Sequence, residues 1–428
     1  MASPGAANIS SVIGGSIGNL VEWYDWYVYS AFSLYFAPSF FPKGDQTAQL
    51  LNAAAVFAIG FLVRPVGGWL LGIYADKHGR KAGLTVSVWL MCAGSLAVAL
   101  TPSYARIGVI APVLLVAARL LQGLSVGGEY GASATYLSEL AGTRRRGFIA
   151  SFQYVTLIAG QLLALAVLLV LQRALSEAQL ADWGWRIPFA IGALASLAAL
   201  QLRRRLVETE AFASIDRTRQ HGLFKRLWAY RRAVALVIGL GAGGSLAFYT
   251  FTTYMQKFLV NTLHWSKPDA SLTSAATLVI YMLIQPAFGA LSDRFGRRPQ
   301  LIVFGVLGLL GTVPLLTTLS HTANHTTALV LILTALTVLS AYTAISGVVK
   351  AELFPAHIRV LGVGLPYALS VSLFGGTAEY AALWFKSAGH EAGFFWYVAT
   401  MCGGSLVAAV LLPTSPLALE ERKGPTRA

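Results

Sequence analysis

Six ionisable side chains stand inside long apolar stretches of the 428-residue sequence. An isolated charge there costs several kcal/mol if the stretches cross a membrane, so such groups are the first candidates for binding and proton transfer. The two basic and four acidic groups are Arg64, Arg119, Glu22, Asp25, Glu129 and Glu379. None of the seven histidines lies well inside an apolar stretch, so proton transfer is expected to use carboxylates.

Glu22 and Asp25 are the predicted proton-coupling pair. They are three residues apart, which places both on one face of a helix. Two neighbouring acids oppose each other's ionisation, whereas a nearby arginine favours it. Arg119 lies at a compatible depth, so we hypothesise that protonation of Asp25 releases Arg119 to bind an anionic substrate. The alternative is a permanent structural salt bridge.

Arg64 and Arg119 are the predicted substrate-binding cations. A guanidinium binds a carboxylate through two parallel hydrogen bonds, so two intramembrane arginines suit an anion with two carboxylates. Arg64 directly precedes Pro65, which is expected to kink the helix. The alternative for Arg64 is a structural pair with Glu22 or Glu129. Three uncharged polar residues are weaker candidates for the same site, because such groups more often join helices: Gln161, Tyr249 and Gln285.

The remaining charges near apolar stretches have more ordinary expected roles. Glu129 and Glu379 are expected to belong to a gate or a packing network. Lys257 and Lys350 lie near the ends of their stretches, so we expect their ammonium groups to reach the membrane surface. No metal-ligating motif is present, so no metal and no cofactor are predicted, and the proton is the expected coupling ion.

The elements that position these groups are predicted to be membrane-spanning helices. Only 12% of the residues are charged and 56% are hydrophobic, which argues against a soluble enzyme and excludes a disordered chain. A helical span needs about 20 mostly apolar residues. Twelve stretches qualify and predict an all-α integral membrane protein: 12–38, 49–73, 83–101, 111–138, 148–171, 186–202, 233–258, 270–291, 300–319, 326–350, 360–386 and 393–413.

The distribution of Lys and Arg predicts the orientation of these spans. The loops on the side of the two termini carry 23 of the 32 basic residues, and the loops on the other side carry seven. Basic loops face the cytoplasm, so both termini are predicted to be cytoplasmic. The formal net charge of +14 is therefore a topology signal, and no nucleic-acid partner is expected.

Two loops repeat one ten-residue pattern at 72–81 and 289–298, with Gly, Asp, Gly and basic residues at matching positions. This repeat predicts two six-helix halves: a bundle at 1–202, a central cytoplasmic loop at 203–232, a second bundle at 233–413 and a tail at 414–428. Gly72 and Gly289 are expected to allow close helix approach, and Gly79 and Gly296 to allow a tight turn.

The charged groups around the repeated loops predict a cytoplasmic gate. Each Asp is expected to pair with a cation and with the N-terminus of a neighbouring helix, and Arg80 and Arg297 to reach Glu139 and Glu352. Such ion clusters would hold the cytoplasmic side shut. The alternative is that the basic residues only set topology, but topology needs no fixed spacing. The predicted gate residues are Asp76, Arg80, Glu129, Glu139, Arg146, Asp293, Arg297, Glu352 and Arg359.

The duplicated loop motif, in twelve spans with a basic central loop, resembles the major facilitator superfamily. Residues 18–29, 119–130 and 183–189 are similar to its metabolite:proton symporter branch. The resemblance implies two pseudo-symmetric six-helix bundles and an acid–arginine pair between the first and fourth spans. It also implies that the chain is not an enzyme. The implied function is proton-coupled import of a dicarboxylate, α-ketoglutarate above all, across the bacterial cytoplasmic membrane by alternating access.

Two other functions stay open on the sequence. One is proton symport of another organic acid or zwitterion, such as citrate, shikimate or a betaine. The other is a nutrient sensor on the same fold that transports nothing. The expected partners are a small carboxylate, protons and the lipid bilayer, and the chain is expected to be a monomer.

Overall fold

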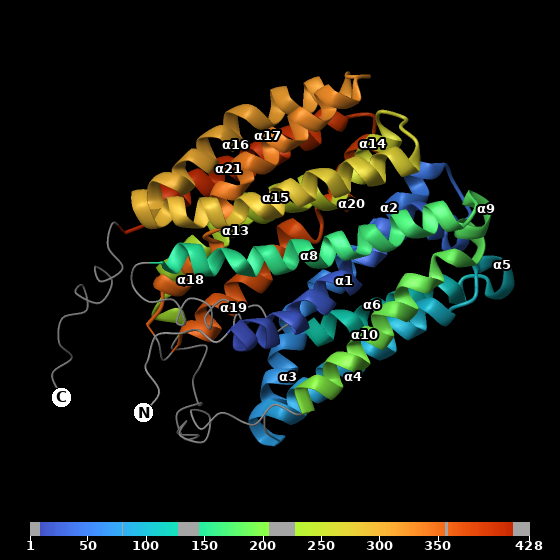
Figure 1. Cartoon of the computed structure of the whole chain (residues 1–428), viewed down its shortest axis with the longest axis horizontal. Coiled ribbons are helices and arrows are strands. Elements are labelled where there is room, and N and C mark those ends of the chain that lie inside the picture. The colour runs from blue at the N-terminus through green and yellow to red at the C-terminus, as the bar shows by residue number, and fades with distance from the viewer. Residues whose placement is uncertain (1–8, 79, 127–144, 205–226, 356–357, 414–428) are drawn as a thin grey trace.

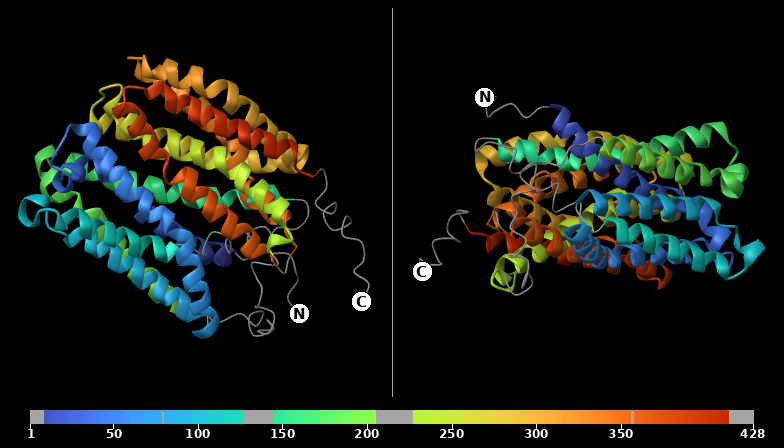
Figure 2. Two further views of the ribbon diagram at one scale, coloured as in Figure 1. Left: turned by 180° about the vertical axis from the view of Figure 1, so that it is seen from behind. Right: turned by 90° about the horizontal axis from the view of Figure 1, so that it is seen from below.

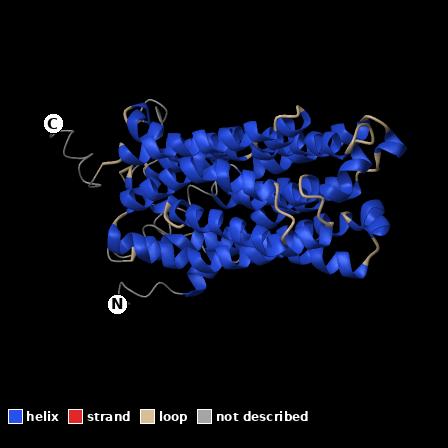
Figure 3. Cartoon of the chain, turned by 90° about the horizontal axis from the view of Figure 1, so that it is seen from above, coloured by secondary structure: helices blue, strands red, loops and turns tan. Residues whose placement is uncertain are grey.

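The computed structural model describes residues 9–78, 80–126, 145–204, 227–355 and 358–413, and the regular elements in these ranges are helices (Figure 3). Six membrane paths form the first half of the chain. They are α1 (Ile9–Phe40), α2 with α3 (Gln46–Leu62 and Arg64–His78), α4 (Arg80–Leu100), α6 (Ile110–Val126), α8 (Arg146–Ala174) and α10 (Arg186–Arg204). Three short segments lie in its loops: α5 (Tyr104–Ile107), α9 (Glu177–Gln179) and the π-helix η1 (Leu180–Gly184).

Six further paths form the second half, and two of them contain a π-helical turn. They are α13–η3–α14 (Arg231–Tyr249, Thr250–Tyr254, Met255–Asn261), α15 (Lys267–Phe295), α16 (Arg297–Ser320), α17–α18 (His325–Thr343, Ser346–Glu352), α19–η4–α20 (Arg359–Ser370, Val371–Gly375, Ala378–Ser387) and α21 (Glu391–Val410).

Every predicted span lies on one of these twelve paths, with residues 127–138 of the fourth span outside the described ranges. Eight helices or helix runs are long and apolar enough to cross a membrane, and three shorter apolar helices at Thr85–Leu100, Ile110–Val126 and Arg186–Ala198 accompany them. The twelfth is α1, with 32 residues. The prediction of an all-α membrane fold is confirmed.

The helices run along the long axis of the molecule in two groups, blue to green for the first half and yellow to red for the second (Figures 1 and 2). α1 begins and α21 ends at the same end of the molecule, which we call the terminal end (Figure 1). The other end, where α9 and α14 lie, is the opposite end.

α8 and α15 hold the two groups together through facing glycines. A Cβ on Gly289 would lie 2.5 Å from the backbone oxygen of Gly147, and a Cβ on Gly147 would lie 2.5 Å from that of Gly289. The close approach predicted for Gly289 is confirmed. The same prediction for Gly72 is wrong, because no described atom lies within 4 Å of its Cβ position. Gly296 makes the predicted tight turn between α15 and α16, with φ at 90°.

Replacing Gly289 with Ala is expected to destabilise the fold, because the new Cβ meets backbone atoms that cannot turn aside. Overpacking of this kind costs about 1–3 kcal/mol. Thermal unfolding of the detergent-solubilised chain measures the loss. Gly311→Ala is the control, since Gly311 lies inside α16 with open space at its Cβ position, and Ala there is expected to be neutral or stabilising. Equal midpoints for the two variants would contradict the role given to the α8–α15 contact.

Candidate functional site

The predicted interruption beside Pro65 is present and produces a contact between the two halves. α2 ends at Leu62 and α3 begins at Arg64. Pro65 has no N–H, so the carbonyl oxygen of Phe61, one turn earlier, loses its helical donor. The Ser372 hydroxyl of η4 donates to that oxygen at 2.6 Å. Pro65 thus leaves the Phe61 carbonyl oxygen free to accept a hydrogen bond from the second half of the chain, immediately beside Arg64.

Arg64 and Arg119 converge on one tryptophan of α1. The guanidinium carbon of Arg64 lies 4.0 Å from the ring centroid of Trp26, and that of Arg119 lies 3.8 Å from it. Arg64 is also 3.7 Å from the Phe61 ring. The Arg64 residue is 5% exposed and Arg119 is fully buried. Aromatic faces attract cations but accept no strong hydrogen bond, so both cations are held without being neutralised.

Each arginine has one edge of its guanidinium group, formed by Nε and Nη2, without a hydrogen-bond partner among the described residues. Among the described residues, no hydrogen-bond partner meets Nε or Nη2 of Arg64, nor Nε or Nη2 of Arg119. These two nitrogens form the edge of a guanidinium that binds both oxygens of a carboxylate. Buried donors without acceptors are costly, so two such edges indicate a site that is completed by anionic groups.

Asp25 lies close to Arg119, as the sequence predicted, but an amide stands between them. Gln122 donates from Nε2 to Asp25 Oδ2 at 2.6 Å, and Arg119 donates from Nη1 to Gln122 Oε1 at 2.7 Å. The Ser95 hydroxyl donates to Oδ1 of Asp25. Asp25 is fully buried. Among the ion pairs of the described residues, none joins Asp25 directly to Arg119, so the connection between acid and cation passes through Gln122.

The other predicted site residues differ in how they are engaged. Glu22 is buried and acts electrostatically on Arg64 and Tyr249. The Tyr249 ring packs on Phe61 at 5.3 Å, beside Arg64. Gln161 is fully buried, and neither atom of its amide has a partner among the described residues. These three stay candidates for the site around Arg64 and Arg119.

Gln285 belongs to a network inside the second half of the chain. Its amide nitrogen donates to Tyr281 O at 3.2 Å and to Ser340 Oγ at 3.0 Å, and its oxygen accepts from Thr343 at 2.9 Å. The structure thus gives Gln285 the helix-joining contacts that the sequence analysis kept as the alternative, and its role in binding stays a prediction.

At the terminal end, the second copy of the repeated motif forms the expected ion cluster. Asp293 accepts from the backbone N–H groups of Gly147 at 2.8 Å and of Phe148 at 3.0 Å, at the N-terminus of α8. Arg297 lies 3.5 Å from Asp293 and 3.0 Å from Glu352. An acid at a helix N-terminus is favoured by the helix dipole. This cluster ties the terminal ends of α8, α15, α16 and α18 together.

The rest of the predicted gate is described only in part. Arg359 donates from Nε to the backbone oxygens of Ala351 and Phe354, both at 3.1 Å, and so caps the end of α18. Arg146 acts electrostatically on Glu352. Glu129 and Glu139 lie outside the described residues, as do the side chains of Asp76 and Arg80, so the first copy of the cluster stays a prediction.

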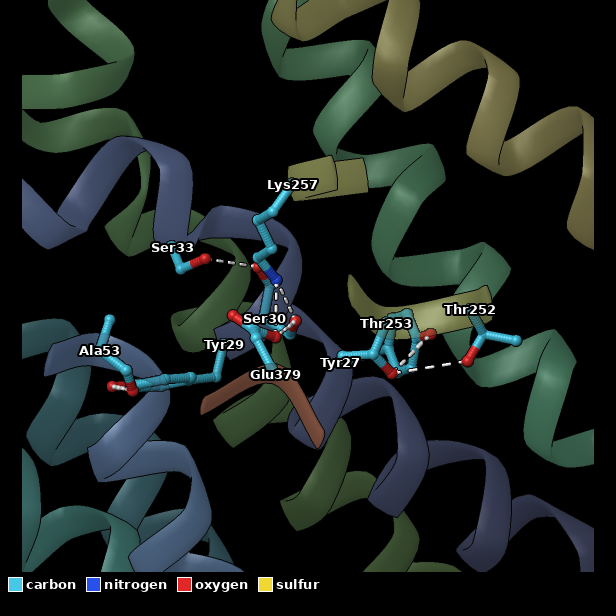
Figure 4. Close-up of polar contacts among 9 residues, drawn as sticks. All are labelled: Tyr27, Tyr29, Ser30, Ser33, Ala53, Thr252, Thr253, Lys257 and Glu379. Atoms are coloured by element: carbon cyan, nitrogen blue, oxygen red, sulfur yellow. Dashed lines mark hydrogen bonds and ion pairs between the residues drawn. The ribbon is translucent and has the colours of Figure 1, made fainter. Parts of the chain in front are cut away.

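A second buried charged cluster joins the two halves (Figure 4). It involves α14, which lies toward the opposite end (Figure 1). Lys257 Nζ of α14 lies 3.0 Å from Glu379 Oε2 of α20. Ser30 of α1 donates to the same oxygen at 3.0 Å and accepts from Lys257. One helical turn before Lys257, the Thr253 hydroxyl donates to the hydroxyl of Tyr27 on α1 at 3.0 Å. α1 of the first half is thereby bonded to two paths of the second half.

The expectation that Lys257 and Lys350 reach the membrane surface is wrong. Lys257 is fully buried and Lys350 is 1% exposed. Lys350 Nζ donates to Ser346 at 2.7 Å and lies 4.2 Å from the ring centroid of Tyr367. Position along a span predicts depth but not which face a side chain takes, and both lysines face the protein interior. Glu379 has the network role that was expected for it.

Gln122 and Ser95 are the site residues that the sequence analysis missed. Gln122 had a readable signal, since it follows Arg119 by three residues and therefore shares its helical face. Ser95 had none, because a serine in an apolar span usually bonds its own helix, as Ser95 also does through Met91 O at 3.1 Å.

Twelve membrane paths in two groups, with two buried arginines that each leave one guanidinium edge unbonded, are the features of a membrane transporter and not of an enzyme. The chain belongs to the major facilitator superfamily. A family model described as sugar (and other) transporter matches residues 12–219, and one described as Major Facilitator Superfamily matches residues 238–428. It is a multi-pass membrane protein, and the relatives it resembles are bacterial.

Among its relatives, the chain is 55% identical to the Alpha-ketoglutarate permease of Escherichia coli, over 94% of this chain and 93% of that protein. It is 35% identical to the Citrate-proton symporter of Klebsiella pneumoniae, over 98% and 95%. The Proline/betaine transporter of Escherichia coli is 33% identical over 87% and 77%.

Solved structures show the same fold. A partially occluded inward open conformation of the xylose transporter XylE from E. coli matches with a TM-score of 0.72 and 20% identity, over 94% of this chain and 97% of that chain. The predicted arrangement of two pseudo-symmetric bundles is thereby confirmed.

Replacing Lys257 with Met is expected to lower the stability of the fold by about 3–5 kcal/mol, because Glu379 then stays buried without its cation. Lys386→Met is the matched control. It removes the cation of the partly exposed Lys386–Glu391 pair, which spans 3.3 Å, and such pairs contribute about 1 kcal/mol or less. Thermal unfolding in detergent compares the two. A Lys257 variant no less stable than the control would show that the buried pair is not a stabilising contact.

Proposed function

We propose that this chain is a proton-coupled importer of a dicarboxylate, with α-ketoglutarate as the leading substrate. The observation that carries this proposal is the pair of buried, open guanidinium edges on Arg64 and Arg119. A dicarboxylate has one carboxylate for each edge. The 55% identity to a protein named Alpha-ketoglutarate permease supports the same substrate.

In this proposal Arg64 and Arg119 bind the two carboxylates, and Trp26 keeps both cations in place. Gln161 and Tyr249 supply neutral polar contacts to the remaining atoms of the substrate. Gln285 is a more remote candidate, held by its own network. No metal or other cofactor is needed, because guanidinium groups alone can satisfy a carboxylate.

Asp25, with Glu22 beside it, is the proposed proton carrier. A dianion that enters an interior-negative cell works against about 2.3 kcal/mol per charge for each 100 mV. One co-transported proton halves that cost and a second cancels it. Asp25 is suited to the task because it is buried and linked to Arg119 through Gln122, so its charge bears on a substrate-binding group.

We place the chain in the bacterial cytoplasmic membrane as a monomer, with both termini in the cytoplasm and its two bundles joined by the central loop at 203–232. The basic loops at the terminal end support this orientation. The terminal end then faces the cytoplasm, and the opposite end faces outward.

Alternating access requires that contacts between the bundles break at one end at a time. At the cytoplasmic side these are the bonds of Asp293 to Gly147 and Phe148. At the outer side they include the bonds of Ser30 to Lys257 and Glu379 and the ion pair of Lys267 with Glu177, which spans 2.7 Å. Both sets combine charge with hydrogen bonds, which water can replace when either side opens.

The proposal is tested by uptake of labelled α-ketoglutarate into cells or energised vesicles that contain the chain. Succinate, citrate, shikimate and a betaine compete in separate arms, with and without a protonophore. Accumulation that a dicarboxylate inhibits best and a protonophore abolishes supports the proposal. Stronger inhibition by citrate or betaine would indicate another substrate. No flux of any of these compounds would favour the alternative of a nutrient sensor that transports nothing.

Replacing Arg64 with Lys is expected to raise the half-saturating concentration of α-ketoglutarate by about tenfold or more, because an ammonium cannot bind both oxygens of a carboxylate in one plane. Initial uptake rates measure the change. The control is Arg173→Lys, which keeps the same chemistry at an exposed position near the end of α8. An unchanged half-saturating concentration would remove Arg64 from the site.

Replacing Asp25 with Asn is expected to abolish accumulation driven by a proton gradient while substrate binding and exchange across the membrane persist. The amide copies the shape of the protonated acid but cannot release a proton. Uptake and counterflow of labelled α-ketoglutarate in vesicles separate the two activities. Proton-driven accumulation that is unchanged in this variant would show that Asp25 is not the proton carrier.

A further inference from the structure

Gln122 is fully buried between Asp25 and Arg119, and the chemistry of its neighbours sets the direction of its amide. Arg119 only donates, so it faces the carbonyl oxygen of Gln122 at 2.7 Å. An ionised Asp25 only accepts, so it faces the amide nitrogen at 2.6 Å. The second N–H of that nitrogen reaches Ser95 Oγ at 3.0 Å. Every hydrogen on the Gln122 amide is thus engaged while Asp25 is ionised.

The helices around this group leave it little room to move. A Cβ on Gly94 of α4 would lie 2.6 Å from Gln122 Cγ, and a Cβ on Gly192 of α10 would lie 2.6 Å from Asp25 Oδ1. The two side chains therefore lie directly against neighbouring backbones. The contact with Gly94 restricts movement of Gln122 Cγ, whereas a turn of the amide about the Cγ–Cδ bond leaves Cγ in place.

The charged and titratable groups that act on Asp25 or on its partner Arg119 come from four helices. Arg119 lies on α6, Cys92 lies on α4, and Arg64, on α3, acts on Arg119. On α1 itself, Tyr24 acts on Asp25, and Glu22 lies one turn from Asp25. Tyr29, also on α1, acts on Arg119, whose guanidinium carbon lies 4.5 Å from the Tyr29 ring centroid. α10 meets Asp25 through Gly192, and residues 147–172 of α8 contain no charged residue. Arg119 is the cation that Gln122 connects to Asp25.

We propose that Gln122 transmits the protonation of Asp25 to Arg119 by turning its amide over. A proton from water that binds Oδ2 of Asp25 makes this atom a donor. The Gln122 oxygen then turns to accept from it, and the Gln122 NH₂ group turns to Arg119, where a donor meets a donor. Arg119 loses its acceptor and is released to a substrate carboxylate. The inference rests on the proton coupling proposed above.

The first test needs no substrate. Trp26 lies 3.8 Å from the Arg119 guanidinium carbon, so release of Arg119 changes the surroundings of this ring. Tryptophan emission of the detergent-solubilised chain is recorded against pH, and Trp26→Phe identifies the part that Trp26 contributes among the ten tryptophans. We expect a Trp26-dependent transition that is lost in Asp25→Asn and in Gln122→Leu.

The matched control is Ser125→Ala. Ser125 is on the same helix as Gln122, is buried, and exchanges hydrogen bonds of 2.7 and 2.8 Å with Ser87 of α4. It therefore tests the general effect of losing a buried polar contact between α4 and α6. This variant is expected to keep the transition.

The second test separates transmission from binding. Affinity for α-ketoglutarate is measured from acid to alkaline pH. The unaltered chain is expected to bind about tenfold more weakly for each pH unit above the transition, since binding is linked to uptake of one proton. Gln122→Leu leaves Arg119 permanently without its acceptor, so its affinity is expected to be independent of pH.

A Gln122→Leu chain that keeps the emission transition and the pH slope overturns the inference. The proton would then sit on Oδ1 of Asp25, where Ser95 accepts it and gives its own hydrogen to Met91 O. A uniform loss of affinity with the slope retained also overturns it. Failure of the unaltered chain to bind any dicarboxylate refutes the proposed substrate instead, and the emission transition still decides the role of Gln122.

Discussion

The structure depends on the cost of placing charge where water is scarce. Arg64, Arg119 and Asp25 are buried among helices of the first bundle, and Lys257 and Glu379 are buried where the bundles meet. Each charge needs compensation from its surroundings. Lys257 and Glu379 compensate each other, whereas the two arginines rest on aromatic rings and keep an open edge. The pair of Lys257 and Glu379 is therefore a contact that holds the bundles together, whereas the open edges of Arg64 and Arg119 form a site that can bind an anion.

Backbone features put these charges in position. Pro65 interrupts the second path next to Arg64 and frees the Phe61 carbonyl for Ser372 of the other bundle. Facing glycines on α8 and α15 bring the bundles into backbone contact. Besides the bond between Ser372 and Phe61, further bonds between the bundles lie toward both ends of the molecule. A chain built in this way can exchange one set of end contacts for the other while the centre keeps its ligand.

Much of the fold could be read from the sequence, because a membrane imposes simple rules. The apolar stretches, the ion cluster of the second loop motif and the turn at Gly296 follow from span length, repetition and backbone sterics, and the structure bears them out. The first copy of the motif, with Gly79, lies largely outside the described residues and stays a prediction. The contact of Arg297 with Glu352 was also predictable, since the repeated spacing placed both at one surface. Gly72 shows the limit of the same reasoning, because its matching position in the repeat does not bring it the same neighbour.

The sequence by itself determined the class of protein and the small set of charges through which it works, since few ionisable residues can enter an apolar span. Only the tertiary structure decided how those charges are paired. It placed Gln122 between Asp25 and Arg119, and it turned Lys257 inward to Glu379. The physical reason is that hydropathy reports the depth of a residue along its helix, whereas partners depend on how each helix is rotated against its neighbours.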